Sequence, residues 1–290
     1  MSLFSELEKF GSKSSQTVQM ETQKNETTNK ESKIETDKEE KVVKKIVPPE
    51  KDFILPKTTE CKVCGHVFKA KTIKSGKVRR LQPDRDLRPR FQYIDALKYD
   101  IISCPICGYS AMTRDFDRIS SAQAKLIKEK ISANFSRVEK EGQEVYSYDT
   151  AIERYKLSLL NTIVKKGKES EKAYTCLKIA WLYRGKADTL SDNIPEEKIV
   201  KEECQKNEET FYFQAYEGFT KAISQEMFPI CGMEESTVDY LLAYMAFHFK
   251  QNEISSKFLG SVLTSSTASR RMKDLALDLK EDIIAQLKRK

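Results

Sequence analysis

Two short cysteine motifs, CKVCG at 61–65 and CPICG at 104–108, constrain what this chain can fold into more than any other feature. In each motif both sulfurs can be aimed at one point, and the glycine permits the positive φ of a tight turn. Four thiolates form a complete tetrahedral ligand set for Zn²⁺. The sequence therefore predicts a structural zinc site with the ligands Cys61, Cys64, Cys104 and Cys107.

Two alternatives compete with a metal site. A redox-active pair normally occurs alone at a helix N-terminus within a βαβ pattern, whereas this chain has two pairs among turn residues. Disulfide bonds need an oxidising compartment, and acidic residues follow Met1 within a few positions, unlike a secretory signal. No apolar run is long enough to cross a bilayer, so we expect a cytoplasmic protein. The remaining cysteines are expected to be buried packing residues: Cys176, Cys204 and Cys231.

The first 55 residues are predicted to be a mostly disordered, charged tail. Residues 12–47 contain no aromatic side chain and few apolar ones, so they cannot bury enough surface to offset their ordering entropy. Four apolar residues ahead of them recur at helical spacing: Leu3, Phe4, Leu7 and Phe10. This short amphipathic segment is either a frayed terminal turn or a docking peptide at the tip of the tail.

Residues 56–118 are predicted to form a zinc-ribbon module. Short alternating segments flank both cysteine motifs and indicate strands, too few to be stable without the folding free energy that a metal supplies. Residues 61–118 carry thirteen lysines and arginines against six aspartates, which equals the +7 of the entire chain. A basic ribbon with interleaved aromatic residues is a candidate nucleic-acid surface. Its candidate contacts are Arg79, Arg80, Arg85 and Arg88.

From 119 to 290 the apolar residues recur with the period of an α-helix, in seven stripes. The first stripe runs from Leu126 to Val138, and the fourth begins at Phe211 after a polar insert at 185–209. Three helices repeat a small, large, large pattern at i, i+4 and i+8, which is typical of the second helix of a tetratricopeptide hairpin: Ala151-Tyr155-Leu159, Ala215-Phe219-Ile223 and Ser255-Leu259-Leu263. We expect three irregular hairpins and a capping helix; the alternative is an ordinary helical bundle.

Stacked hairpins present a concave face lined by the first helix of each pair. In the helix at 238–249 the expected core stripe comprises Val238, Leu241, Leu242, Met245 and Phe249. Tyrosine and arginine residues outside such stripes are candidate partner contacts, because they combine contact area with a hydrogen-bonding end. These candidates are Tyr183, Arg184, Tyr240 and Tyr244. The alternative is that they are solvated or pack against the next helix.

Four segments together resemble a known bacterial family: CKVCG at 61–65, YDIISCPICGYSAM at 99–112, LKIAWLYRGKA at 177–187 and GMEESTVDYLLAYMAFHF at 232–249. The family is the one catalogued as domain of unknown function 2225, and the resemblance covers about residues 55–287. It implies paired zinc-ribbon knuckles, with Cys61, Cys64, Cys104 and Cys107 as metal ligands, followed by tetratricopeptide-like helices. It implies no established activity.

The sequence shows few features of an enzyme. It contains only two histidines, His66 and His248, and none of the HExxH, GxSxG or GxxxxGK[ST] motifs. Four cysteines also complete the zinc shell and leave no position for a reactive water. The sequence therefore predicts a non-enzymatic scaffold or adaptor that binds a protein partner through helical repeats. Nucleic-acid binding by the basic ribbon is the alternative.

Overall fold

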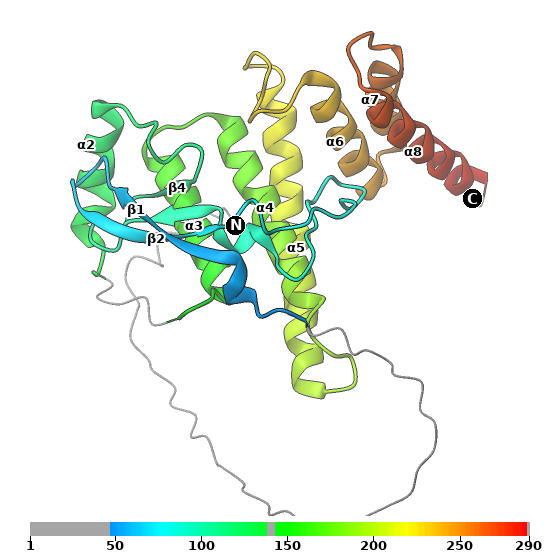
Figure 1. Cartoon of the computed structure of the whole chain (residues 1–290). Helices are drawn as coiled ribbons and strands as arrows, with labels where there is room; N and C mark the ends of the chain where they lie inside the picture. The colour runs from blue at the N-terminus through cyan, green and yellow to red at the C-terminus, as the bar shows by residue number, and fades with distance from the viewer. Residues whose placement is uncertain (1–46, 138–142, 289–290) are drawn as a thin grey trace, which may run out of the picture. The chain divides into compact units, whose positions relative to one another are not determined.

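The structure is a computed structural model that describes residues 47–137 and 143–288 (Figure 1). The predicted amphipathic segment and almost all of the predicted polar tail lie outside these residues. Among the helices that are described, none is long and apolar enough to cross a membrane.

Each cysteine motif forms the turn of an antiparallel hairpin. A 3-10 turn, η2 (Glu50–Phe53), leads into β1 (Ile54–Glu60), which pairs with β2 (Val67–Ile73) so that Glu60 lies opposite Val67 across the first motif. A second 3-10 turn, η3 (Ala96–Tyr99), precedes β3 (Ile101–Ser103), which pairs with β4 (Ser110–Met112) across the second motif. The two hairpins belong to separate two-stranded sheets. A small antiparallel β region is therefore present around the cysteine motifs, as predicted.

Seven α-helices follow in the described part of the chain, and they confirm the predicted helical character of its second half. Their bounds are α2 (Ser121–Lys130), α3 (Tyr148–Val164), α4 (Glu169–Ala187), α5 (Pro195–Ala222), α6 (Glu235–His248), α7 (Asn252–Thr264) and α8 (Arg270–Lys288), with the 3-10 turn η4 (Ser132–Asn134) after α2. Several starts have local causes. Ser120 and Gln123 form a capping box at α2, Ser147 caps α3, and Pro195 is at the first turn of α5.

Small residues determine how closely the helices approach. The predicted small positions Ala151, Ala215 and Ser255 are fully buried, and Tyr155 and Phe219 one turn later are buried as well. A Cβ atom added at Gly218 of α5 would lie 2.8 Å from the Cβ of Ala173 on α4. Helices α4 and α5 therefore pack as a close antiparallel pair, and α6 with α7 makes a second pair (Figure 1).

Two predicted stripes have different bounds in the structure. The first ends early, because α2 stops at Lys130 and the chain turns so that the Phe135 ring lies against Gly108 in the second cysteine turn. The fourth starts early, because most of the polar insert is the exposed first half of α5, which begins at Pro195 rather than near Phe211. Acidic residues in its first turn, Glu196 and Glu197, suit the positive end of the helix dipole.

The core is continuous between the hairpins and the helices. One apolar cluster joins the buried cysteines to Ile127 of α2, and a second joins Phe53 and Tyr99 to Tyr146, just before α3. Helix α3 packs directly on β3 and β4. The predicted boundary between residues 118 and 119 therefore separates strands from helices, while the residues from Pro49 onward form one compact unit.

Candidate metal centre

The two cysteine turns have the same backbone hydrogen bonds. In the first, the Gly65 amide donates to the Cys61 carbonyl at 2.8 Å, and the Cys61 amide donates to the His66 carbonyl at 2.9 Å. In the second, the corresponding bonds run from Gly108 to Cys104 at 3.1 Å and from Cys104 to Tyr109 at 2.8 Å. Both glycines have positive φ, +75° and +71°. We call these two turns the knuckles; local chemistry alone explains their shape.

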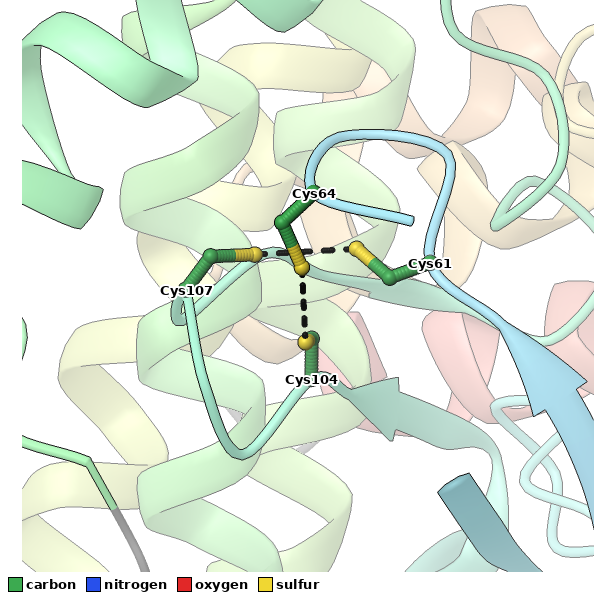
Figure 2. A group of neighbouring side chains, drawn as sticks. All are labelled: Cys61, Cys64, Cys104 and Cys107. Atoms are coloured by element: carbon green, nitrogen blue, oxygen red, sulfur yellow. Dashed lines mark hydrogen bonds between the residues drawn. The ribbon is translucent and has the colours of Figure 1, made fainter. Parts of the chain in front are cut away.

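The knuckles bring four sulfurs together, as the sequence predicts. The sulfur atoms of Cys61, Cys64, Cys104 and Cys107 all lie within 4.8 Å of one another. The shortest separations, 3.6 Å each, join Cys61 to Cys107 and Cys64 to Cys104, so each pair spans the two knuckles (Figure 2). A disulfide bond would need about 2.0 Å, and all four are free cysteines. The cluster could hold a metal ion.

The close approach of the sulfurs gives the cysteine thiols different pKa values. Hydrogen bonds from Cys107 and then from Cys61 lower the pKa of the Cys104 thiol. The hydrogen bond with Cys104 is the main cause that raises the pKa of Cys61 and of Cys107, and burial raises both further. Cys104 is therefore the most acidic of these three thiols. Because cysteine binds a metal ion as the thiolate, a bound cation would favour the deprotonated form of all four.

The surroundings hold the knuckles from behind. The Ser132 hydroxyl, after α2, donates to the Cys107 carbonyl at 2.9 Å, and the Asn161 amide of α3 donates to the Gly108 carbonyl at 3.1 Å. The rings of Tyr109 and Phe116 pack beside the buried sulfurs, with their centroids 4.9 Å apart. His66 is exposed, stacks on Phe68 and does not belong to the cysteine cluster. The cluster is thus a closed site within the core, with only Cys64 exposed.

The loop between the knuckles reaches the helices. We call residues 84–88 the clasp. Asp86 is 1% exposed and accepts from the Trp181 indole at 2.8 Å, while the Arg184 guanidinium lies 2.8 Å from the same carboxylate. Arg88, also buried, pairs with Asp95 at 2.9 Å. The clasp thereby gives the buried Trp181 indole its acceptor and adds a carboxylate to the partners of Arg184.

The clasp continues to the last helices (Figure 1). The Tyr240 hydroxyl donates to the Arg85 carbonyl at 2.8 Å, and the Arg85 guanidinium lies 2.5 Å from the Asp282 carboxylate of α8. The Leu87 side chain packs on the apolar cluster of α6, α7 and α8. The loop between the two knuckles therefore contacts α4, α6 and α8.

The structure corrects one of the four predicted nucleic-acid contacts. Arg88 is 1% exposed and pairs with Asp95, so it neutralises a carboxylate of the chain itself. Arg85 is exposed and forms a surface ion pair with Asp282 of α8. Arg79 and Arg80 are exposed, and the Arg80 guanidinium lies over the Phe91 ring. Arg88 and Arg90 of the loop are thus opposed by Asp84, Asp95 and Asp188.

The predicted partner contacts are also corrected. Tyr240 is fully buried, Tyr183 is buried against Phe211, and Arg184 is paired with Asp86 and Glu208. Tyr244 is half-buried beneath the Arg85 guanidinium. Three of these four, all but Tyr183, converge on one face of the helices, but the clasp already covers that face. They are therefore not available to a partner in this conformation.

Sequence reasoning missed Asp84 and Asp86, which lie in a loop that otherwise suggests a basic surface. One signal existed, because a buried Trp normally needs an acceptor for its indole N–H. Trp181 lies in a helix whose apolar stripe predicts burial, yet its acceptor is 95 residues away in sequence. Periodicity within one segment cannot find such a partner.

These features define a class: a small antiparallel β region that carries a buried four-cysteine cluster, joined by a shared core to a set of paired helices. Residues 54–283 match the family described as "Uncharacterized protein conserved in bacteria (DUF2225)". The match spans most of the chain, so the chain belongs to this family, as its motifs predicted. No curated protein and no solved structure shows a significant match to this chain.

Proposed function

We propose that this protein is a non-enzymatic cytoplasmic scaffold or adaptor that binds a protein partner through its helices and is stabilised by structural zinc. The observation that supports the proposal best is the set of four cysteine sulfurs between the two hairpins, with Cys61, Cys104 and Cys107 buried. Such a set holds a metal without offering it to a substrate. The helical region then remains as the larger surface for recognition.

Zinc is the metal that fits these ligands. Zn–S bonds of about 2.3 Å in a tetrahedron separate the sulfurs by about 3.8 Å, close to the 3.6 Å between the paired sulfurs. Thiolates also favour Zn²⁺ over the hard cations Mg²⁺ and Ca²⁺. The cytoplasm suits the proposal because thiols stay reduced there.

A tetratricopeptide-like arrangement is the finer proposal for the helices. It is supported by the buried small residues Ala151, Ala215 and Ser255 at corresponding positions of α3, α5 and α7. It is also supported by the close α4–α5 and α6–α7 pairs. Repeats of this kind present side chains from successive helices to one extended ligand.

Cross-linking of the full chain to its partners in cell extract, followed by mapping of the cross-linked residues, tests the proposed function. Cross-links to α4–α8 from one reproducible protein are expected. The scaffold proposal fails if cross-links come only from residues 54–118, or if every captured protein is lost on adding salt and nuclease. Metal analysis of the same sample should give one zinc per chain.

Nucleic-acid binding is a second candidate, and a surface hollow of about 360 Å³ beside the first knuckle favours it. Three lysines line this hollow together with the start of α2: Lys62, Lys125 and Lys128. If they bind phosphates, each lysine-to-alanine change should reduce the salt slope of binding by about one. Arg79→Ala with Arg80→Ala tests the exposed part of the original loop prediction. Absence of DNA or RNA binding by wild type at low salt refutes this candidate.

A further inference from the structure

Helix α8 carries a second apolar stripe, on the flank next to its buried stripe. Its inner residues are buried against α6 and α7: Met272, Ala276, Leu279 and Ile283. Outside them, Leu277, Ile284 and Leu287 are 48%, 42% and 55% exposed. Large apolar side chains this exposed are common singly, but three in register along one helix form a continuous strip.

Two lysines complete the register of this strip. Lys273, Leu277, Lys280, Ile284 and Leu287 follow one another at intervals of four, three, four and three residues. This is the spacing by which one α-helix packs against another along a seam. We call these five residues the α8 seam.

The lysines of the seam are not used within the fold. Among residues 47–137 and 143–288, neither Lys273 nor Lys280 has a carboxylate within ion-pair distance, whereas Arg85 of the clasp takes Asp282 on another side of the same helix. A surface that combines apolar side chains with two unpaired cations is complementary to an apolar helix with carboxylates at matching positions.

We infer that the α8 seam is the docking site for an amphipathic α-helix of a protein partner, with apolar residues at three- and four-residue spacing and glutamates or aspartates opposite Lys273 and Lys280. This inference rests on the proposed scaffold function and gives it a specific surface. It also moves the partner site from the face covered by the clasp to an exposed flank of the last described helix.

Two other occupants fit less well. A second copy of α8 would set lysines against lysines in a parallel pair and would set Lys273 against an apolar side chain in an antiparallel pair, and neither arrangement gives the lysines a carboxylate. An anionic lipid surface would meet Asp274 and Glu281, which border the seam one helical turn from Leu277 and Ile284. A partner helix avoids this conflict, because it can set carboxylates over the lysines and a neutral edge over the two acidic residues.

Binding of designed helical peptides to the full chain tests the inference. Each probe has about three heptads with Leu at both apolar positions. One probe carries Glu on the first flank and Gln on the second, and the other has these flanks exchanged. In matched controls Lys replaces Glu. At least one Glu probe should bind with a Kd of about 100 µM or tighter, and its Lys control about tenfold more weakly.

Variants of the protein decide where the probe binds. Ile284→Asp should abolish binding, and Lys280→Glu should reverse the preference between the Glu probe and the Lys control. Lys257→Glu, the same charge change at an exposed position of α7, should leave binding unchanged. All three sites are exposed, so the circular dichroism spectrum and metal content should match wild type.

The negative outcomes are distinct. If no Glu probe binds at about 1 mM, the seam inference is wrong, while the scaffold proposal stands as long as α4–α7 still cross-link to a partner. If wild type dimerises in sedimentation and Ile284→Asp is monomeric, the seam is a self-interface and the inference is overturned. If cross-links to helices are absent altogether, the scaffold proposal fails first.

Discussion

The indole Nε1 of Trp181 donates a hydrogen bond to the Oδ2 atom of Asp86 at 2.8 Å, although the two residues are 95 positions apart. Both side chains are buried, and the Asp86 carboxylate also holds Arg184. Asp86 lies midway between the two knuckles, so the ends of its loop are fixed by the cysteine cluster. The loop between the knuckles therefore links the cysteine cluster to α4, in addition to the core that the hairpins share with α2 and α3.

Loss of the metal should reach beyond the β hairpins. Cys104→Ser, or chelation of wild type, should release the metal and raise hydrogen exchange in β1–β4, in the clasp and in α6 and α8. Helices α4 and α5 should keep their protection, because they pack on each other through apolar side chains. Hydrogen exchange with mass spectrometry measures each segment. A change confined to residues 54–112 would show that the clasp does not transmit the loss.

The Asp86 carboxylate is the clasp contact whose removal should cost most. Asp86→Ala leaves the Trp181 indole without its acceptor and removes one of the carboxylates around Arg184, which keeps Glu208, and we expect a loss of about 2 kcal/mol in unfolding free energy. Metal content should stay at the wild-type level, since no sulfur is touched. Asp117→Ala, at an exposed position, is the control and should change stability little. Equal unfolding free energies of the two variants would contradict the role given to the clasp.

The parts of the fold that follow from short-range rules were predictable. The knuckles depend on five consecutive residues each, and the helices on periods within one segment, so both could be expected from the sequence. The clasp could not, because its contacts join Arg85 to Tyr240 and Asp282 across most of the chain. Tyr240 was misplaced for the same reason. It lies off the main apolar stripe of α6, yet the clasp and α8 cover that side too.

Glycine-to-alanine changes in the knuckles distinguish the backbone strain of a positive φ from the steric clash of an added Cβ atom. Gly76→Ala is the control, since its φ is ordinary and a Cβ there meets nothing within 4 Å. Gly65→Ala has open space but positive φ, so it should cost about 1 kcal/mol. Gly108→Ala adds a Cβ 2.5 Å from the Phe135 ring and should be the least stable. Resistance of bound metal to a chelator should fall in the same order.

A second substitution tests that collision. Gly108→Ala combined with Phe135→Ala removes the ring that the new Cβ meets, so chelator resistance should recover part of the way toward that of Gly65→Ala. If the double variant loses more chelator resistance than the two single variants lose together, Phe135 supports the knuckle by more than filling space.

Asp239 should make stability depend on pH. Burial, and secondarily the charge of Glu235, raises its pKa from 3.8 to about 6. A carboxyl with a raised folded-state pKa contributes stability that is present below the unfolded pKa and is lost as pH rises through the folded pKa, here between about pH 4 and 6. Asp239→Asn should therefore raise the melting temperature at about pH 7.5 and change it little at about pH 4. Asp278→Asn, at an exposed position of α8, is the matched control.

Sequence reasoning assigned Leu242 and Tyr240 of α6 to different faces. Substitution of either residue should now lower the unfolding free energy, by different amounts. Leu242 is fully buried, and Leu242→Ala should lower the unfolding free energy by about 2–5 kcal/mol through lost burial and a residual cavity. Tyr240→Phe keeps the buried ring and deletes only the hydroxyl that donates to the Arg85 carbonyl. It should cost about 1 kcal/mol, while Tyr240→Ala should cost several times more, as a large core deletion does. Chemical denaturation measures all three. If Tyr240→Ala is as stable as wild type, this side of α6 is open to solvent and the clasp does not cover it.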